Sequence, residues 1–205
     1  MIKKVTGLCL AVLMLGLAMV AHAAPPGPTD QLKETVDAIL VILKDNPGAN
    51  GIKDEKILAL VDERFNFTGM AQRVLAKNWR KASAEQKARF VELFRQLLSN
   101  SYLGRVRAYT DEKVRYGKEQ IKKEKYAMVD TVIVSGNTDI PIDYKLQLMN
   151  DKWLVYDVVI EEVSLVQTYR SNYQTIVNDK GMDGLLVQMK EKLDEPVEEG
   201  GASPG

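Results

Sequence analysis

The chain has 205 residues with 28 basic side chains, 28 acidic side chains and one histidine, so its formal net charge is zero at pH 7. This balance argues against general nucleic-acid binding, which requires a strong positive field. The only cysteine, Cys9, and the only histidine, His22, both lie near the amino terminus.

The first 23 residues have the pattern of a secretory signal peptide. A positively charged start precedes an unbroken apolar run over 8–20, which is too short for a stable membrane span. Ala21-His22-Ala23 then supplies small residues for signal peptidase. A lipoprotein signal is the alternative, but Cys9 lies early in the apolar run and follows Leu8, which is not small. We therefore expect an exported chain that is cleaved before Ala24.

Cleavage would remove both Cys9 and His22 and leave a mature chain without cysteine or histidine. That composition excludes disulfides, thiolate or imidazole metal ligands, and Cys–His or Ser–His–Asp catalysis. Two lysines of the 28 basic residues leave as well, so 26 remain against 28 acidic residues. We expect a single domain over 24–194 and a disordered tail rich in Pro, Gly and Glu over 195–205.

Apolar residues at helical spacing predict helices before and after a central group of strands. The longest helix follows Ser83 and Gln86, which have the spacing of a capping box, and Ser164 and Gln167 repeat that spacing. An Asn-Pro-Gly sequence at 46–48 ends the first helix. The predicted helices begin at the N-cap Thr29, after Asp54 and after Thr68, and cover 84–110, 165–177 and 183–193.

From residue 113 the apolar residues repeat with a period of two, which predicts strands over 114–116, 126–135, 141–149 and 152–160. Asn150-Asp151 predicts a tight hairpin turn. The strand over 152–160 is apolar on both sides, so we expect it to be central and covered on each face. The predicted fold class is α+β, a small twisted antiparallel sheet covered by helices.

Asp157, Glu161 and Glu162 form the one carboxylate group that could suggest acid–base catalysis. Negative charge just before a helix start is also favoured by the helix dipole, and this structural interpretation is the stronger one. Two basic runs, one around Trp79 and one over 122–125, are either solvated faces or docking surfaces.

A series of short motifs extends along both halves of the chain. The first half contains Phe65-Asn66-Phe67, Met70, Leu75, Trp79-Arg80, Gln86, Phe90, Phe94, Arg95, Tyr102 and Tyr109. The second half contains Pro141-Ile142-Asp143-Tyr144, Trp153-Leu154-Val155-Tyr156-Asp157-Val158, Glu161, Val163-Ser164-Leu165-Val166 and Tyr169-Arg170. Over about 29–193 the chain therefore resembles the MlaC, or toluene-tolerance, family of periplasmic phospholipid-binding proteins. It has Asn66 where that pattern has Asp, and Ala76 where it has Gly.

The resemblance implies a periplasmic carrier that holds a phospholipid, has no other cofactor and no metal, and catalyses no covalent chemistry. Its implied partners are an outer-membrane lipoprotein–porin complex and an inner-membrane ABC transporter complex, between which it would maintain outer-membrane lipid asymmetry through transient docking. Two alternatives remain open: a chaperone-like carrier of lipoproteins or unfolded outer-membrane proteins, and a small enzyme without histidine or cysteine.

A lipid carrier of this fold requires an apolar cavity between the sheet and its helices. Candidate lining residues share apolar or aromatic character and a position on the central strands or the covering helices. They are Phe94, Leu98, Tyr102, Val106, Val132, Val134, Tyr144, Leu146, Val155, Val159, Val163 and Val166.

Overall fold

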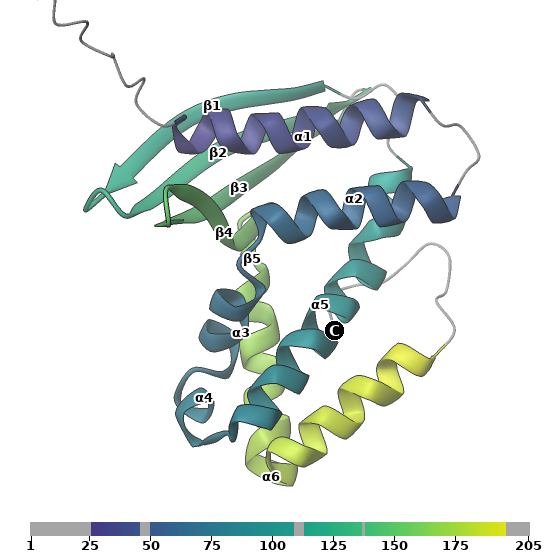
Figure 1. Cartoon of the computed structure of the whole chain (residues 1–205), viewed down its shortest axis with the longest axis vertical. Coiled ribbons are helices and arrows are strands. Elements are labelled where there is room, and N and C mark those ends of the chain that lie inside the picture. Colours follow the sequence, from purple (N-terminus) through teal and green to yellow (C-terminus); the bar gives the residue numbers. More distant parts are fainter. Residues whose placement is uncertain (1–25, 46–49, 109–112, 137, 196–205) are drawn as a thin grey trace, which may run out of the picture.

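The computed structural model describes residues 26–45, 50–108, 113–136 and 138–195 (Figure 1). The predicted signal peptide, the helix end at 46–48 and the tail beyond residue 195 lie outside the described residues. The elements are α1 (Pro28–Asp45), α2 (Asn50–Arg64), α3 (Phe67–Leu75), α4 (Lys77–Lys81), α5 (Ala84–Arg107), β1 (Lys113–Lys122), β2 (Tyr126–Ser135), β3 (Thr138–Met149), β4 (Lys152–Ile160), β5 (Val163–Ser164) and α6 (Leu165–Asp194). Within these ranges no helix is long and apolar enough to cross a membrane.

The five strands form one antiparallel sheet in the order β1-β2-β3-β4-β5, which confirms the expected α+β class. β1 is longer than predicted because it pairs along the whole of β2, from Lys113 opposite Val134 to Lys122 opposite Tyr126. β4 pairs with β3 on one side and with the two-residue strand β5 on the other, so it is an inner strand of the sheet, as predicted.

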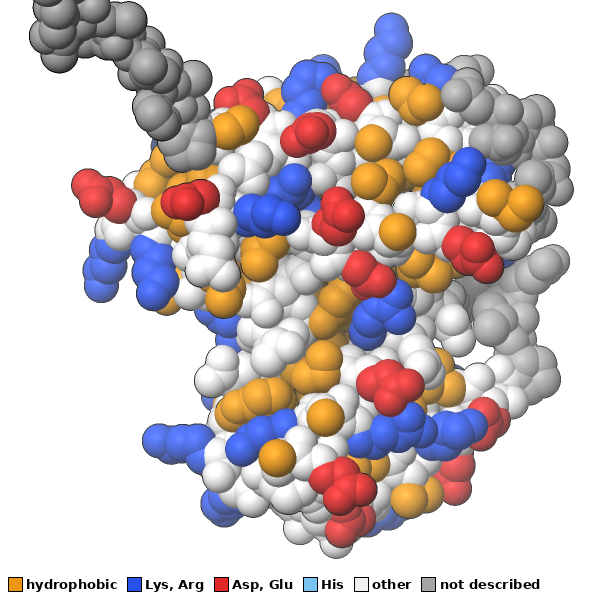
Figure 2. Space-filling view, in the orientation of Figure 1, with side chains coloured by type: hydrophobic (Ala, Val, Ile, Leu, Met, Phe, Trp, Pro, Cys, Tyr) orange, Lys and Arg blue, Asp and Glu red, His pale blue; other side chains and the backbone are white. Residues whose placement is uncertain are grey.

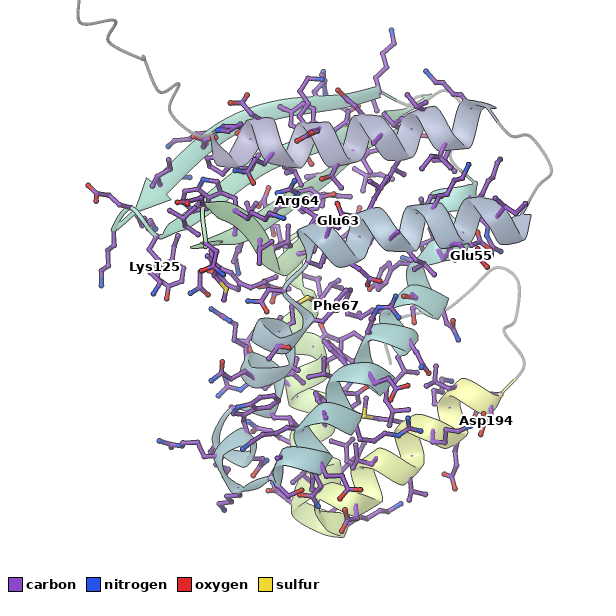
Figure 3. All side chains as sticks on the ribbon, viewed as in Figure 1. Glu55, Glu63, Arg64, Phe67, Lys125 and Asp194 are labelled. Carbon is purple, nitrogen blue, oxygen red and sulfur yellow. The ribbon has the colours of Figure 1, made fainter. Side chains whose placement is uncertain are left out.

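α1 crosses the sheet and α2 runs beside it (Figure 1), and a partly buried polar network joins both helices to β4. Its centre is Arg64, which is labelled in Figure 3. Arg64, at the end of α2, donates from Nε to Thr35 Oγ1 at 2.8 Å and from Nη1 to Gln31 Oε1 at 2.8 Å. Its Nη1 also donates to the Trp153 carbonyl oxygen at 3.1 Å, and the Trp153 amide donates to Gln31 Oε1 at 3.0 Å. This network fixes the angle at which both helices meet the sheet.

A second group of helices, α3, α5 and α6, packs together at the other end of the molecule (Figure 1). Its centre is aromatic: Phe90 and Phe94 stack with centroids 5.7 Å apart, and Tyr169 meets Phe94 edge-on at 5.2 Å. Tyr173 meets Phe90 edge-on at 5.8 Å, and burial raises the pKa of its hydroxyl. These rings lock α6 against α5 below the sheet.

Local sequence signals set several helix ends as predicted. Ser83 Oγ accepts from the Gln86 amide and Gln86 Oε1 accepts from the Ser83 amide, both at 3.0 Å, which confirms the first capping box. Ser164 Oγ accepts from the Gln167 amide at 3.2 Å and caps α6. Within α6, Gly181 has a φ of 71° and a ψ of −175°, which breaks the helix into two segments, in agreement with the two helices predicted over 165–177 and 183–193.

Candidate ligand-binding site

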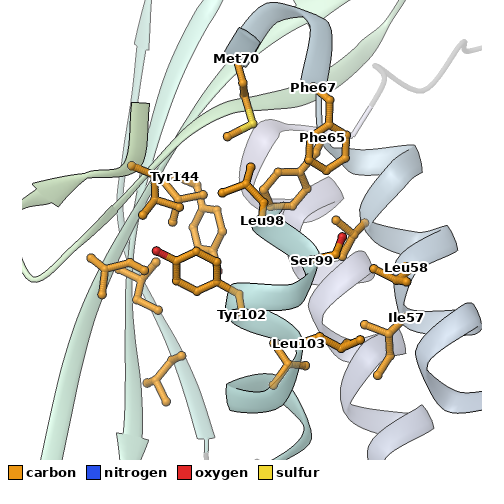
Figure 4. A pocket seen from close by; sticks show the side chains of 17 residues that line it. Ile57, Leu58, Phe65, Phe67, Met70, Leu98, Ser99, Tyr102, Leu103 and Tyr144 are labelled. Atoms are coloured by element: carbon orange, nitrogen blue, oxygen red, sulfur yellow. The ribbon is translucent and has the colours of Figure 1, made fainter. Parts of the chain in front are cut away.

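A cavity of about 240 Å³ lies between one face of the sheet and helices α2, α3 and α5 (Figure 4). Apolar side chains also reach the surface in the hollow between α2 and the helices α3 and α5 (Figure 2). The cavity is lined by residues from segments far apart in the sequence. They are Ile57, Leu58, Val61, Phe65, Phe67, Met70, Leu98, Ser99, Tyr102, Leu103, Val106, Ile133, Ile142, Tyr144, Val158, Ile160 and Leu165.

The sheet wall of the cavity follows from strand register. Tyr144 lies opposite Val158, and Ile142 lies opposite Ile160, so these four side chains project from the same face. Ile142 is also opposite Thr131, two residues before Ile133 on β2, which places Ile133 on that face as well. Successive side chains of a strand point to opposite faces, so every second residue of three adjacent strands contributes to one apolar wall.

The helix wall follows from helical periodicity. On α2 the lining residues Ile57, Leu58 and Val61 recur at intervals of three and four, so they share one face. On α5 the lining residues from Leu98 to Val106 recur in the same way. Figure 4 shows Ile57 and Leu58 opposite Ser99 and Leu103 across the gap between the two helices.

The lining contains no acidic or basic residue, and its few polar groups remain neutral. The Ser99 hydroxyl donates to the Arg95 carbonyl oxygen of its own helix at 2.9 Å. Burial raises the pKa of both Tyr102 and Tyr144 to about 12, so both phenols are protonated at neutral pH. Such a lining suits a hydrocarbon ligand and offers no group for metal binding or acid–base chemistry.

The structure distributes the twelve predicted lining residues over four environments. Those in the cavity lining are Leu98, Tyr102, Val106 and Tyr144. Those buried in the hydrophobic core are Phe94, Leu146, Val155 and Val166. Those on the opposite face of the sheet are Val132, Val134 and Val159, and Val163 on β5 is 52% exposed.

Three predicted residues lie on the opposite face of the sheet. Strand alternation defines two faces, but it does not determine which of them the helices cover. On β2, Val132 pairs with Pro141 and so points away from Ile133 and the helices. On β4 a bulge intervenes: Lys145 pairs with Asp157 and Leu146 with Val155, which leaves Tyr156 as an extra residue. Beyond the bulge the inner face passes from odd to even positions. Val159 therefore turns outward.

Sequence reasoning missed the α2 wall and the aromatic pair before α3. Phe65 and Phe67 stack with ring centroids 5.9 Å apart and close one end of the cavity. The apolar stripe of α2 was visible in the sequence. However, an apolar stripe has the same spacing whether it packs against a core or borders a cavity.

Asp157, one of the three carboxylates considered for catalysis, has a structural role. The residue is 4% exposed, and its carboxylate accepts from Ser164 Oγ at 2.8 Å, from the Val166 amide at 3.1 Å and from Lys145 Nζ at 2.9 Å. These contacts tie β4 to the first turn of α6. Glu161 and Glu162 have φ values of 48° and 69° in the tight turn that joins β4 to β5. Nothing in this arrangement forms an acid–base pair.

Known proteins share this sequence pattern and this fold. A sequence model of the MlaC protein family matches residues 33–191. An intermembrane phospholipid transport system binding protein MlaC from Haemophilus influenzae is 24% identical over 137 residues, and the match covers 64% of this chain and 64% of that protein. A toluene tolerance protein from Pseudomonas putida is 23% identical over 168 residues, covering 81% of this chain and 77% of the relative.

Among solved structures, a phospholipid-binding protein from Ralstonia solanacearum, determined in complex with a phospholipid, has the same fold. The TM-score is 0.76 at 23% identity, and the superposition covers 82% of this chain and 97% of that chain. Fold and cavity thus define an α+β protein in which one sheet face and three helices enclose an apolar pocket. The chain belongs to the MlaC family.

Proposed function

We propose that this chain is a periplasmic phospholipid carrier that holds its ligand by the acyl chains in the cavity between the sheet and α2, α3 and α5. The observation that carries the proposal is the lining, which is apolar and uncharged and is built by a chain of the MlaC family. The Haemophilus relative is named for intermembrane phospholipid transport, and the Ralstonia protein holds a phospholipid.

The energetics of transfer suit a carrier that catalyses no reaction. Each buried methylene contributes about 0.8 kcal/mol, so about 30 methylenes contribute roughly 25 kcal/mol. A lipid that leaves a bilayer gives up nearly the same amount, and the exchange is therefore close to neutral. The carrier needs a dry cavity and a mouth that leaves the head group in water.

The volume of the cavity sets the scale of what it can enclose. A cavity of about 150 Å³ accommodates one benzene ring, so 240 Å³ corresponds to roughly ten carbon atoms. A complete acyl chain is larger than this, so it would extend beyond the enclosed volume or displace part of the lining.

Lipid extraction tests the proposed function directly. Protein exported to the periplasm and purified without detergent should release a stoichiometric amount of phospholipid into organic solvent, as identified by mass spectrometry. Protein that is empty, monodisperse and unable to take lipid from vesicles would overturn the proposal. Preferential binding of acylated protein or unfolded polypeptide would instead support the chaperone alternative.

The proposal extends to partners and processing. A carrier of this kind must meet a donor and an acceptor, and we propose the outer-membrane lipoprotein–porin complex and the inner-membrane ABC transporter complex for these roles. We also propose that the mature chain begins at Ala24 as a single lipid-binding domain, which amino-terminal sequencing of periplasmic protein would test.

A further inference from the structure

Two bidentate ion pairs bridge α2 and α5 beside the cavity. Arg95 Nε donates to Asp62 Oδ1 at 2.5 Å, and its Nη2 donates to Asp62 Oδ2. Arg107 Nε donates to Asp54 Oδ1 at 2.7 Å, and its Nη2 donates to Asp54 Oδ2. A bidentate arginine–carboxylate pair restricts the geometry of both side chains more than a single hydrogen bond does.

The pairs bracket the cavity lining on both helices. On α2, Asp54 and Asp62 lie eight positions apart, about 12 Å of helix, and the lining residues of α2 fall between them on the same stripe. On α5, Arg95 and Arg107 lie twelve positions apart, about 18 Å, and the α5 lining falls between them. One ion pair therefore stands at each end of the gap between the helices.

The two helices meet across that gap through their side chains. α2 packs along α1 and touches β4, whereas its backbone hardly approaches that of α5. The space between them is filled by the lining side chains seen in Figure 4. Separation of α2 from α5 would widen the cavity that their side chains line, and it is the movement that these ion pairs oppose.

We propose that the Asp62–Arg95 and Asp54–Arg107 pairs form an ionic latch that closes the α2–α5 side of the cavity and controls the rate at which lipid enters and leaves. The four side chains are positioning residues, because none of them lines the cavity. The inference rests on the proposed function. It adds the place where lipid passes, between α2 and α5, and the ion pairs that control this passage.

The exposure of the Asp62–Arg95 pair suits a reversible latch. Its side chains are 39% and 36% exposed, so water and salt reach them, whereas in the second pair Arg107 is 40% exposed and Asp54 is 15% exposed. An ion pair as exposed as Asp62–Arg95 is weak, and its loss should change the exchange rate by about two- to fivefold without unfolding the protein. Exchange should also become faster as ionic strength rises, because screening weakens both pairs.

Cross-linking tests the latch most sharply, since the exported chain has no native cysteine after signal cleavage. The double variant Asp62→Cys with Arg95→Cys is joined by a short bis-methanethiosulfonate reagent, which dithiothreitol removes. Fluorescent phosphatidylethanolamine is then offered in phosphatidylethanolamine–phosphatidylglycerol vesicles. We expect uptake to fall at least tenfold in the cross-linked protein and to recover after reduction. The matched control joins Lys33→Cys and Asp37→Cys within α1, an exposed ion pair remote from the cavity lining, and should leave uptake unchanged.

Charge substitutions provide the second arm. Asp62→Asn should speed both uptake and release about two- to fivefold and flatten the salt dependence, and the exchanged pair Asp62→Arg with Arg95→Asp should restore the original rate. Equal uptake with and without the cross-link, or unaltered kinetics in Asp62→Asn, would overturn the latch while leaving the carrier intact. Failure of the unmodified protein to take up any lipid would instead overturn the proposed function itself.

Discussion

Asp143 occupies an unfavourable position for a carboxylate on the outer face of the sheet. It lies opposite Asp130 in the β2–β3 ladder. Burial, and then the charge of Asp130, raise its pKa, although Lys145 partly offsets both effects. Asp130 Oδ1 is itself buried without a hydrogen-bond partner. Two like charges are thus held together across neighbouring strands, which costs stability whenever both are ionised.

Replacement of Asp143 should relieve this repulsion. Because the folded-state pKa of Asp143 is raised, the contribution of this residue to stability is fully present below its unfolded-state pKa and is lost as pH rises through the folded-state pKa. Asp143→Asn should therefore raise the free energy of unfolding at pH 7 by about 0.5 kcal/mol. The gain should vanish below about pH 4, where the carboxyl is protonated. Urea unfolding at several pH values measures this difference. A gain that persisted at pH 3 would contradict the explanation, and Asp139→Asn on the same strand serves as the control.

At the scale of single elements, the long carboxy-terminal helix depends on one glycine. Gly181 has φ and ψ angles that only glycine adopts readily, and this break turns the second half of α6 back along α5 (Figure 1). Across the break, Gln86 Nε2 in the first turn of α5 donates to Asp183 Oδ1 at 2.7 Å. The first half of α6 is fixed separately, through the contacts of Asp157 with its first turn.

Gly181→Ala should lower the free energy of unfolding by about 2 kcal/mol, because the added Cβ forces a strained backbone. No atom lies within 4 Å of that Cβ, so the cost arises from the backbone and not from a clash. Gly104→Ala in α5 is the matched control, since this site is also open but has helical geometry. It should stabilise the protein by about 0.5–1 kcal/mol. Thermal unfolding of both variants compares the two effects, and equal shifts would contradict this account.

Considering the whole molecule, the cavity is enclosed by several elements together, and no single element encloses it. Its walls come from α2, α3, α5, three strands and the start of α6. The aromatic centre between α5 and α6 stabilises one end of the molecule, and the Arg64 network fixes α1 and α2 on the sheet. Between these two rigid regions lies the α2–α5 gap.

A substitution that fills the cavity tests ligand binding in a protein that remains folded. Ile133→Trp places an indole in the cavity and should reduce the lipid bound per molecule at least threefold, whereas Val132→Trp, one residue away on the outer face, should not. Both proteins should remain folded, as judged by circular dichroism. Lipid extraction and mass spectrometry give the ratio, and equal lipid content in the two variants would rule out this cavity as the site.

Local sequence patterns were sufficient to predict the features that depend on near neighbours. The capping box at Ser83 and Gln86, the Ser164 cap of α6, the break in α6 and the hairpin turn at Asn150-Asp151 were predictable because each depends on residues a few positions apart, although Gln167 does not complete the second capping box. The α+β class followed from the change of period near residue 113. The sheet face that lines the cavity could not be predicted in this way, because alternation defines two equivalent faces and the bulge at Tyr156 exchanges them along β4. Only the tertiary structure brought α2 to the cavity and set Asp62 beside Arg95, since these contacts join segments that no local pattern relates.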